Sequence, residues 1–348
     1  LFWNRTQKRS QGKGIPMSLS NLTVSRRQVV GLGLGLATTL GLVACGSSES
    51  SDASGSSSTD SSTDATEDTE DETVQIDSSA YDALIATGSV ADDAAISAST
   101  WATKVKDAGT MRVGGVQTSM LFSLLDETDG KLRGFDAGLA QLLARYVLGD
   151  ESKIENTQVT SDTRESVLQN DQVDTVFATY SISDKRKEVI SFAGPYYTTQ
   201  QSILVNVDNT DINSVDDLAG KNVAAQSGST GPSILEELAP DATIQEFKTD
   251  EEARAALSQG RVDAYVIDTN MQLGSMVRNP GKYRLAGDPF GPVDAYGIGL
   301  PLDSDGVDFV NVFLHKVEDE GLWEDLWKIC IGNRAGIEDV PEPPAIGA

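Results

Sequence analysis

The sequence predicts an α/β protein made of two similar lobes that face each other across a cleft. Helical patterns alternate with short runs rich in Val and Ile, which indicates open and mostly parallel sheets. Two segments, 168–176 and 257–265, share one layout: a helix end and a tight turn lead through Val-Asp into a short apolar strand. Because such sheets bind ligands beyond the carboxyl ends of their strands, we expect a small-molecule site between the lobes.

The composition limits the kinds of partner and chemistry that are expected. The chain has 348 residues, 39% of them hydrophobic, which is enough for one or two cores. A formal net charge of −26 argues against nucleic acid as a partner. Two cysteines and the single histidine, His315, are too few for a zinc site or a His-centred triad. We therefore expect no metal site, no cofactor and no catalysis by a His-centred triad.

Residues 1–44 are typical of an export signal. Two arginines at 26–27 precede an apolar, Gly-rich run that is short for a membrane span, and a small residue stands before Cys45. The sequence Leu42-Val43-Ala44-Cys45 resembles a bacterial lipobox, and the paired arginines resemble a twin-arginine signal. This predicts lipidation of Cys45 and anchorage at the outer face of the cell membrane, on the cell surface or in the periplasm. Met17 is a candidate start of translation.

The segment 45–75 is predicted to be the lipidated cysteine followed by a disordered acidic tether. From Ser47 to Thr73 the chain contains almost only Ser, Asp, Thr, Glu, Ala and Gly, with no aromatic or large aliphatic residue. Such a segment cannot form a core, and self-repulsion extends it. Contact with the membrane is therefore expected through the lipid anchor only.

The folded body begins after the tether. Its first regular strand is expected at Met111, followed by a helix that Asp136 caps and that ends at Gly149. Gln200-Gln201 and Ala286-Gly287-Asp288 are the predicted crossings between the lobes. The predicted parts are leader helices at 76–108, lobe 1 at 109–200, lobe 2 at 201–287, and a return to lobe 1 with C-terminal helices at 288–348.

In lobe 1, Arg186 is the candidate anion-binding residue. Thr179 ends a strand, and Ser183 is the expected cap of the short helix that follows, so Arg186 falls in its first turn. A cation there opposes the helix dipole and needs an anionic partner, and a guanidinium suits a carboxylate best. A neighbouring Asp or Glu is the alternative partner.

In lobe 2, a strand breaks at the loop 226–232 and a helix begins. The free backbone N–H groups there, with the side chains of Gln226, Ser229 and Thr230, make a candidate anion site, although they could simply cap the helix. Asp268, at a strand end of the same lobe, would receive an ammonium group. Together with Arg186, these residues predict a clamp for a zwitterion.

The body from about Lys104 to Gly332 resembles the amino-acid-binding proteins of ABC importers, most closely their glutamate-binding branch. The resemblance implies a type II periplasmic-binding-protein-like fold, with two α/β lobes, a two-stranded hinge and the ligand cleft between the lobes. The segments that carry it are Gly134-Phe135-Asp136, Val173-Asp174, Ala178-Thr179-Tyr180-Ser181-Ile182, Lys185-Arg186-Lys187, Phe192-Ala193-Gly194-Pro195-Tyr196-Tyr197, Leu218-Ala219-Gly220-Lys221 and Gly321-Leu322-Trp323.

The same resemblance implies roles for site residues. Arg186 should hold the ligand α-carboxylate with help from Thr230 and the backbone around Ser181. Asp268, Thr179 and Ser181 should receive the α-ammonium.

In glutamate-binding relatives, an arginine at the start of the helix before Val-Asp reaches the side-chain carboxylate, and Arg164 matches it. A pair with a surface acid is the alternative for Arg164. The aromatic residue that the family often carries in the loop after the first strand is missing from 117–121.

The implied function is capture of a polar amino acid, glutamate, by hinge closure, and its delivery to the permease of an ABC importer. The folded body is expected to be a monomer. Two alternatives are a ligand sensor for a membrane receptor and an enzyme on the same fold, such as a dehydratase.

Overall fold

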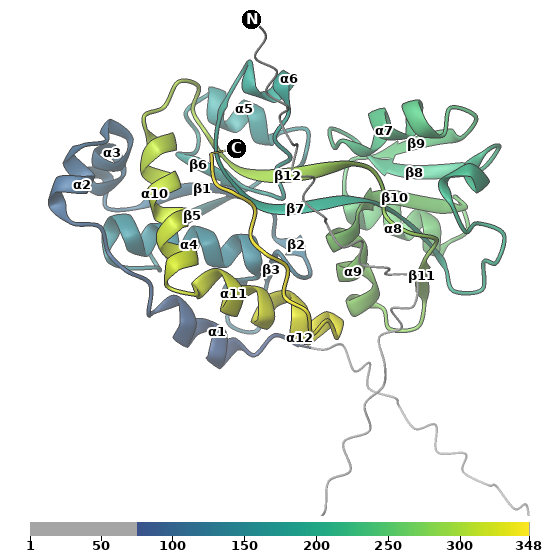
Figure 1. Cartoon of the computed structure of the whole chain (residues 1–348), viewed down its shortest axis with the longest axis horizontal. Helices are drawn as coiled ribbons and strands as arrows, with labels where there is room; N and C mark the ends of the chain where they lie inside the picture. Colours follow the sequence, from purple (N-terminus) through teal and green to yellow (C-terminus); the bar gives the residue numbers. More distant parts are fainter. Residues whose placement is uncertain (1–74, 348) are drawn as a thin grey trace, which may run out of the picture. The chain divides into compact units, whose positions relative to one another are not determined.

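The computed structural model describes residues 75–347, and it confirms the predicted fold class of two α/β lobes joined by two strands (Figure 1). The predicted export signal, Cys45 and the tether up to residue 74 lie outside the described residues. We call lobe 1 the part built around the first parallel strands and lobe 2 the part built around the later ones. Within residues 75–347, no helix has the length and apolar character needed to cross a membrane.

Nine strands of the described chain form one mixed sheet that runs through both lobes. The parallel pairs β1–β5 and β1–β6 belong to lobe 1, and β8–β9 and β8–β10 belong to lobe 2. In spatial order the strands are β5 (Ile154–Gln158), β1 (Met111–Gly115), β6 (Thr175–Phe177), β12 (Phe290–Leu300), β7 (Ser191–Asn206), β10 (Ala264–Asp268), β8 (Asn222–Gln226) and β9 (Thr243–Phe247), while β11 (Tyr283–Leu285) pairs with β7.

Two long antiparallel strands, β7 and β12, pass from one lobe to the other (Figure 1). In β7 the passage lies at Gln201, which pairs with Phe290 of β12 and with Asp268 of β10. The return lies after 286–288, between Phe290 and Asp294, where the register of β12 against β7 shifts. The segment 286–288 itself belongs to lobe 2, because the Ala286 amide donates to the carbonyl of Ile203 at 2.8 Å. The predicted position of the return crossing was therefore a few residues too early.

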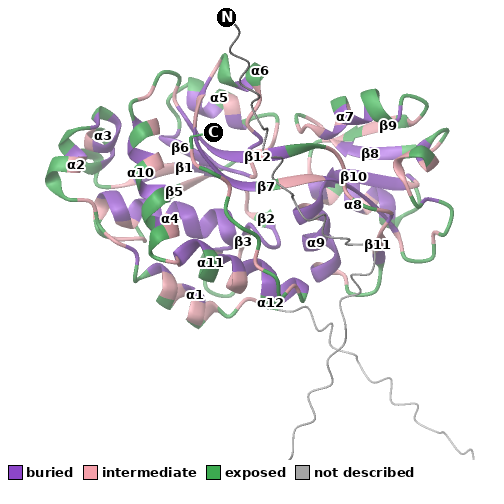
Figure 2. Cartoon of the chain, viewed as in Figure 1, coloured by how far each residue is buried: buried purple, intermediate pink, exposed green. Residues whose placement is uncertain are grey.

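In lobe 2, alternate strand residues face helices on opposite sides of the sheet. Val266 of β10 packs in a cluster with Leu235 of α7 (Gly231–Leu238). Its neighbour Tyr265 packs in another cluster with Leu257 of α8 (Asp250–Ser258) and Met276 of α9 (Thr269–Arg278). Because successive side chains point to opposite sides, β10 lies between two helical layers. Both of its faces are therefore buried (Figure 2).

The core of lobe 1 is larger and rich in aromatic residues, including Phe122, Phe135, Tyr196, Tyr296 and Trp323. The remaining elements of the chain are α1 (Ser78–Ile85), α2 (Asp93–Ser97), α3 (Thr100–Ala108), β2 (Thr118–Ser119), β3 (Ser123–Leu125), β4 (Leu132–Arg133), α4 (Phe135–Leu148), α5 (Arg164–Gln169), α6 (Asp184–Lys187), α10 (Gly306–Asp319), α11 (Leu322–Trp327) and α12 (Asn333–Ala335), with short turns of other helix types at Val215–Leu218 and Lys328–Gly332.

Asp136 does not cap α4, contrary to the prediction. The cap residue is Gly134, whose φ of 141° and close approach to the backbone of Phe122 leave no room for a side chain. Asp136 lies buried in the first turn, where its carboxylate accepts hydrogen bonds from the Thr179 amide and the Tyr196 hydroxyl, both at 2.7 Å. Burial raises the pKa of Asp136 to about 7. This contact fixes Thr179 at the end of β6.

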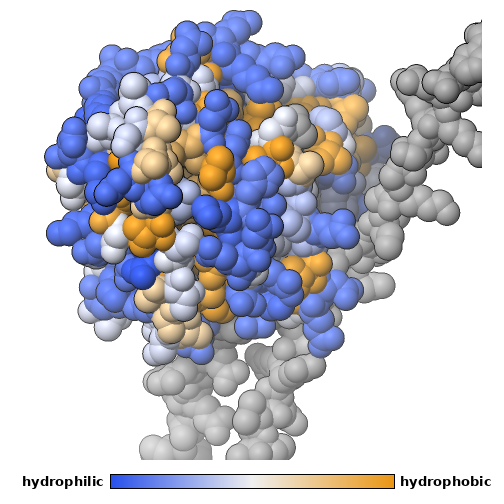
Figure 3. Space-filling view, turned by 60° about the vertical axis from the view of Figure 1, so that its left-hand side comes forward, coloured by the Kyte–Doolittle hydropathy of each residue, from blue (hydrophilic) through white to orange (hydrophobic). Residues whose placement is uncertain are grey.

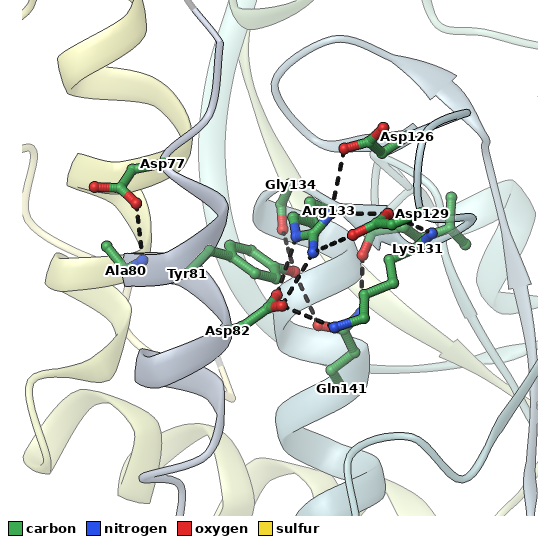
Figure 4. Close-up of polar contacts among 11 residues, drawn as sticks. Asp77, Ala80, Tyr81, Asp82, Asp126, Asp129, Lys131, Arg133, Gly134 and Gln141 are labelled. Atoms are coloured by element: carbon green, nitrogen blue, oxygen red, sulfur yellow. Dashed lines mark hydrogen bonds and ion pairs between the residues drawn. The ribbon is translucent and has the colours of Figure 1, made fainter.

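The helix α1 is fastened to lobe 1 by a polar cluster (Figure 4). Asp82 accepts hydrogen bonds from Arg133 at 3.0 Å and from Lys131 at 2.8 Å, and Arg133 also pairs with Asp129 at 2.7 Å. The buried Tyr81 hydroxyl donates to Gln141 of α4 at 3.0 Å. These contacts join α1 to the β3–β4 hairpin and to α4.

The face of the molecule shown in Figure 3 is mostly hydrophilic, and its apolar residues form small separate groups. This agrees with the 53 acidic and 27 basic residues of the sequence.

Candidate functional site

The structure brings the predicted strand ends together where β7 and β12 pass between the lobes. Asp268 ends β10 and is 7% exposed. Its carboxylate accepts hydrogen bonds from Gln201 of β7 and from the Tyr296 hydroxyl of β12, both at 2.5 Å. Both crossing strands therefore hold this carboxylate, which is placed as the sequence predicted.

Asp294 lies in the same cluster and was missed by the sequence analysis. It stands on β12 opposite Thr199, and its Oδ2 accepts a hydrogen bond from the Thr230 hydroxyl of lobe 2 at 3.0 Å. Burial, and then the nearby charge of Asp294, raises the pKa of Asp268 to about 7, and burial also raises the pKa of Asp294. The site thus contains two neighbouring carboxylates, where the sequence analysis had placed one.

Arg186 occupies the predicted position in α6. Ser183 caps this helix by accepting a hydrogen bond from the Arg186 amide at 3.3 Å. The guanidinium is buried, and it donates to the carbonyl of Ser181 at 2.7 Å and, across the cleft, to the carbonyl of Gly228 at 2.8 Å. The predicted alternative, an acidic partner, is present in part, because Glu165 lies 3.5 Å from Nε. A guanidinium has five N–H groups, so two carbonyl contacts leave donors for a ligand carboxylate.

Arg164 is 2% exposed and lies beside Arg186. Its Nη1 donates to the carbonyl of Ala178 at 2.9 Å, and its guanidinium lies 4.0 Å from the ring centre of Tyr180. Among residues 75–347, no acidic side chain lies within ion-pair distance of Arg164, and its Nε has no hydrogen-bond partner. The structure therefore does not show the alternative pairing with a surface acid. Burial, with a further contribution from Arg186, lowers the pKa of Arg164 to about 10.

The loop 226–230 of lobe 2 reaches lobe 1. The Ser227 hydroxyl donates to Asp162 at 2.5 Å, and Gly228 accepts from Arg186. Gly228 has a φ of 71°, and a Cβ there would lie 2.9 Å from the backbone nitrogen of Asp162. On the far side of the cleft, Arg278 donates to the carbonyl of Thr118 at 2.8 Å. The lobes are therefore in contact on both sides of the site.

The remaining predicted residues differ in what their side chains do. Thr230 faces the site through its bond to Asp294, and Ser181 contributes its backbone carbonyl, which accepts from Arg186. Ser229 instead makes local bonds at the start of α7, where its hydroxyl accepts from the Gly231 amide at 3.2 Å. For Ser229 the alternative of simple helix capping describes the structure. Gln226 donates to the carbonyl of Lys248 at 3.4 Å.

A cavity of about 110 Å³ lies between the lobes. Thr179 and Ser161 line it from lobe 1, and Gln226 and Met271 line it from lobe 2. A larger cavity of about 380 Å³ lies inside lobe 1 between α4 and the sheet. Neither cavity is lined by Arg164, Arg186, Asp268 or Asp294. The convergence of charged groups, and not the cavity volume, therefore identifies the ligand site. The described residues contain no group of three or more His, Cys, Asp or Glu that could hold a metal ion.

Comparison with known proteins identifies the family of most of the described chain. The family of bacterial extracellular solute-binding proteins, family 3, matches residues 111–328. The glutamine-binding protein GlnH of Bacillus subtilis (strain 168) is 35% identical over 219 residues, which are 62% of this chain and 79% of that protein. The glutamate-binding protein GluB of Corynebacterium glutamicum is 33% identical over 230 residues, which are 63% of this chain and 78% of that protein.

Among solved structures, an ancestral arginine-binding protein bound to glutamine has a TM-score of 0.60 and 33% sequence identity. The match covers 64% of this chain and 98% of that chain. The helices α1, α2 and α3 lie before the range that the family matches.

Proposed function

Because this chain belongs to family 3 of the bacterial extracellular solute-binding proteins, we propose that it binds a polar amino acid between its lobes for an ABC importer. The proposal is supported by a buried guanidinium, Arg186, which bonds a carbonyl of the other lobe, and by a buried carboxylate, Asp268, which both crossing strands hold. A zwitterion offers the complementary pair of charges. The family consists of solute-binding proteins, so the chain is a binding protein and not an enzyme.

We assign the α-carboxylate of the ligand to Arg186, with help from Thr230 and the backbone around Ser181. The α-ammonium is assigned to Asp268, Thr179 and Ser181. Closure of the lobes excludes water and strengthens each of these contacts.

Glutamate is the proposed ligand because Arg164 is a buried cation without an acidic partner among the described residues. A side-chain carboxylate would neutralise it. Glutamine is the second candidate, and the presence of Asp294 in the site favours it, since a neutral side chain adds no further negative charge. Among the relatives, GluB is named for glutamate and GlnH for glutamine.

The test is a calorimetric comparison of glutamate, glutamine, aspartate and cystine on the purified protein. We expect glutamate to bind most tightly and glutamine next. Absence of binding by all four amino acids contradicts the proposal, and tightest binding of glutamine replaces the first candidate by the second.

Binding should weaken as the pH falls. Asp268 has to be ionised to hold an ammonium group, and its raised pKa means that it takes up a proton as the pH falls through about 7. The association constant measured from pH 7.5 to 5.5 should therefore decrease, by up to roughly tenfold per pH unit at the lower end. A constant affinity over this range would show that Asp268 is already ionised in the free protein or does not hold the ligand.

Lipid anchorage through Cys45 and delivery to a permease remain predictions. A sensor for a membrane receptor would use the same pocket, and co-purification with a permease would separate the two roles.

A further inference from the structure

We propose that Asp294 is a specificity-determining residue of this site, because its carboxylate competes with the carboxylates of the ligand for Arg164 and Arg186. It thereby disfavours amino acids with an acidic side chain relative to those with a neutral one. This inference rests on the proposed function and concerns how the site discriminates between glutamate and glutamine.

The position of Asp294 gives it access to both lobes. It lies on β12 at the crossing, is 9% exposed, and bonds the Thr230 hydroxyl of lobe 2. Thr230 is assigned to the ligand, so Asp294 bonds a group that the ligand would use.

The charged groups that face Asp294 come from three other elements. Arg186 of α6 and Arg164 of α5 attract its negative charge, and Asp268 of β10 is close enough to interact with it. The Tyr296 hydroxyl, two residues along β12, is occupied by Asp268. Neither arginine forms an ion pair with Asp294 at 4.0 Å or less among the described residues. Asp294 therefore holds neither guanidinium group in an ion pair, which leaves both able to bind a carboxylate of the ligand.

The charges around the ligand side chain explain the expected effect. Arg164 attracts the side-chain carboxylate of glutamate and Asp294 repels it, whereas the neutral side chain of glutamine is affected little by either charge. Asp294 therefore reduces the preference for glutamate without reversing it. The ammonium and α-carboxylate are common to glutamate and glutamine. The ratio of glutamate affinity to glutamine affinity therefore reports only how Asp294 affects binding of the ligand side chain.

The test is calorimetry with glutamate and glutamine on wild-type protein and on Asp294→Asn. Asparagine keeps the shape and an acceptor for Thr230 but removes the charge. The ratio of glutamate to glutamine affinity is expected to rise at least about tenfold, which is about 1.4 kcal/mol. Asp241→Asn, which removes the same charge from an exposed loop of lobe 2, should leave the ratio unchanged. Arg164→Met should lower the ratio.

A second measurement needs no substitution. Burial raises the pKa of Asp294 above its ordinary value, so as the pH falls Asp294 takes up a proton before the glutamate side chain, whose ordinary pKa is about 4.3. The ratio should therefore rise in the wild-type protein and stay flat in Asp294→Asn. If the ratio of glutamate to glutamine affinity in the wild type does not change with pH, and both affinities fall together in the variant, the inference is overturned. Asp294 then has a purely structural role. Wild-type protein that binds neither amino acid contradicts the proposed function, and the inference falls with it.

Discussion

Arg186→Ala is expected to abolish amino-acid binding. The side chain is 7% exposed, and its two carbonyl contacts aim the guanidinium at the junction of the lobes. Without it the α-carboxylate of the ligand would be buried and unpaired. Loss of one partner of a buried pair costs about 3 to 5 kcal/mol. This corresponds to an affinity lower by about 100-fold to more than 1,000-fold.

Titration calorimetry with glutamate and glutamine measures this loss. Arg261→Ala is the matched control, because it removes the same charge from an exposed position in lobe 2. Arg186→Lys keeps the charge but not the bidentate geometry, so it should fall between the wild type and the alanine variant. Affinity within a factor of two of the wild type would remove Arg186 from the site.

Gly228→Ala is expected to block closure of the lobes around the ligand. In this structure, where the lobes are in contact, a Cβ at this position would lie 2.9 Å from backbone atoms of Ser161 and Asp162. Backbone atoms cannot move aside as a flexible side chain can. The φ of 71° adds the ordinary cost of a left-handed alanine, about 1 kcal/mol. The variant should fold, bind ligand at least about tenfold more weakly, and fail to become more compact when ligand is added.

Small-angle scattering with and without glutamate measures the compaction. Gly220→Ala separates backbone strain from the contact between lobes, because Gly220 has a φ of 72° but no atom within 4 Å of an added Cβ. This control should lose a similar amount of stability and still close. Normal compaction of Gly228→Ala would show that the contact between Gly228 and lobe 1 is not part of ligand binding.

Local sequence signals were sufficient for the parts of the site that follow strands. Thr179 and Asp268 were found because each stands five residues after an aspartate that opens a short apolar strand. The cap at Ser183 and the loop before α7 follow from rules that concern only a few neighbouring residues. These elements were therefore predictable without knowledge of the tertiary structure.

The errors arose where distant segments decide the role of a residue. Asp136 has the sequence context of a helix cap, but its partners are Thr179 and Tyr196, 43 and 60 residues away. Asp294 was missed because the pattern of β12 does not reveal where the strand crosses between lobes. The available signal was an acidic residue in a strand that continues with apolar residues.

A crystal structure of the protein grown with glutamate or glutamine would show where the ligand binds. We expect one amino acid between the lobes, with its α-carboxylate within hydrogen-bond distance of Arg186 and its ammonium within hydrogen-bond distance of Asp268. An amino acid bound instead in the larger cavity of lobe 1, with Arg186 and Asp268 bonded only to protein groups, would contradict it.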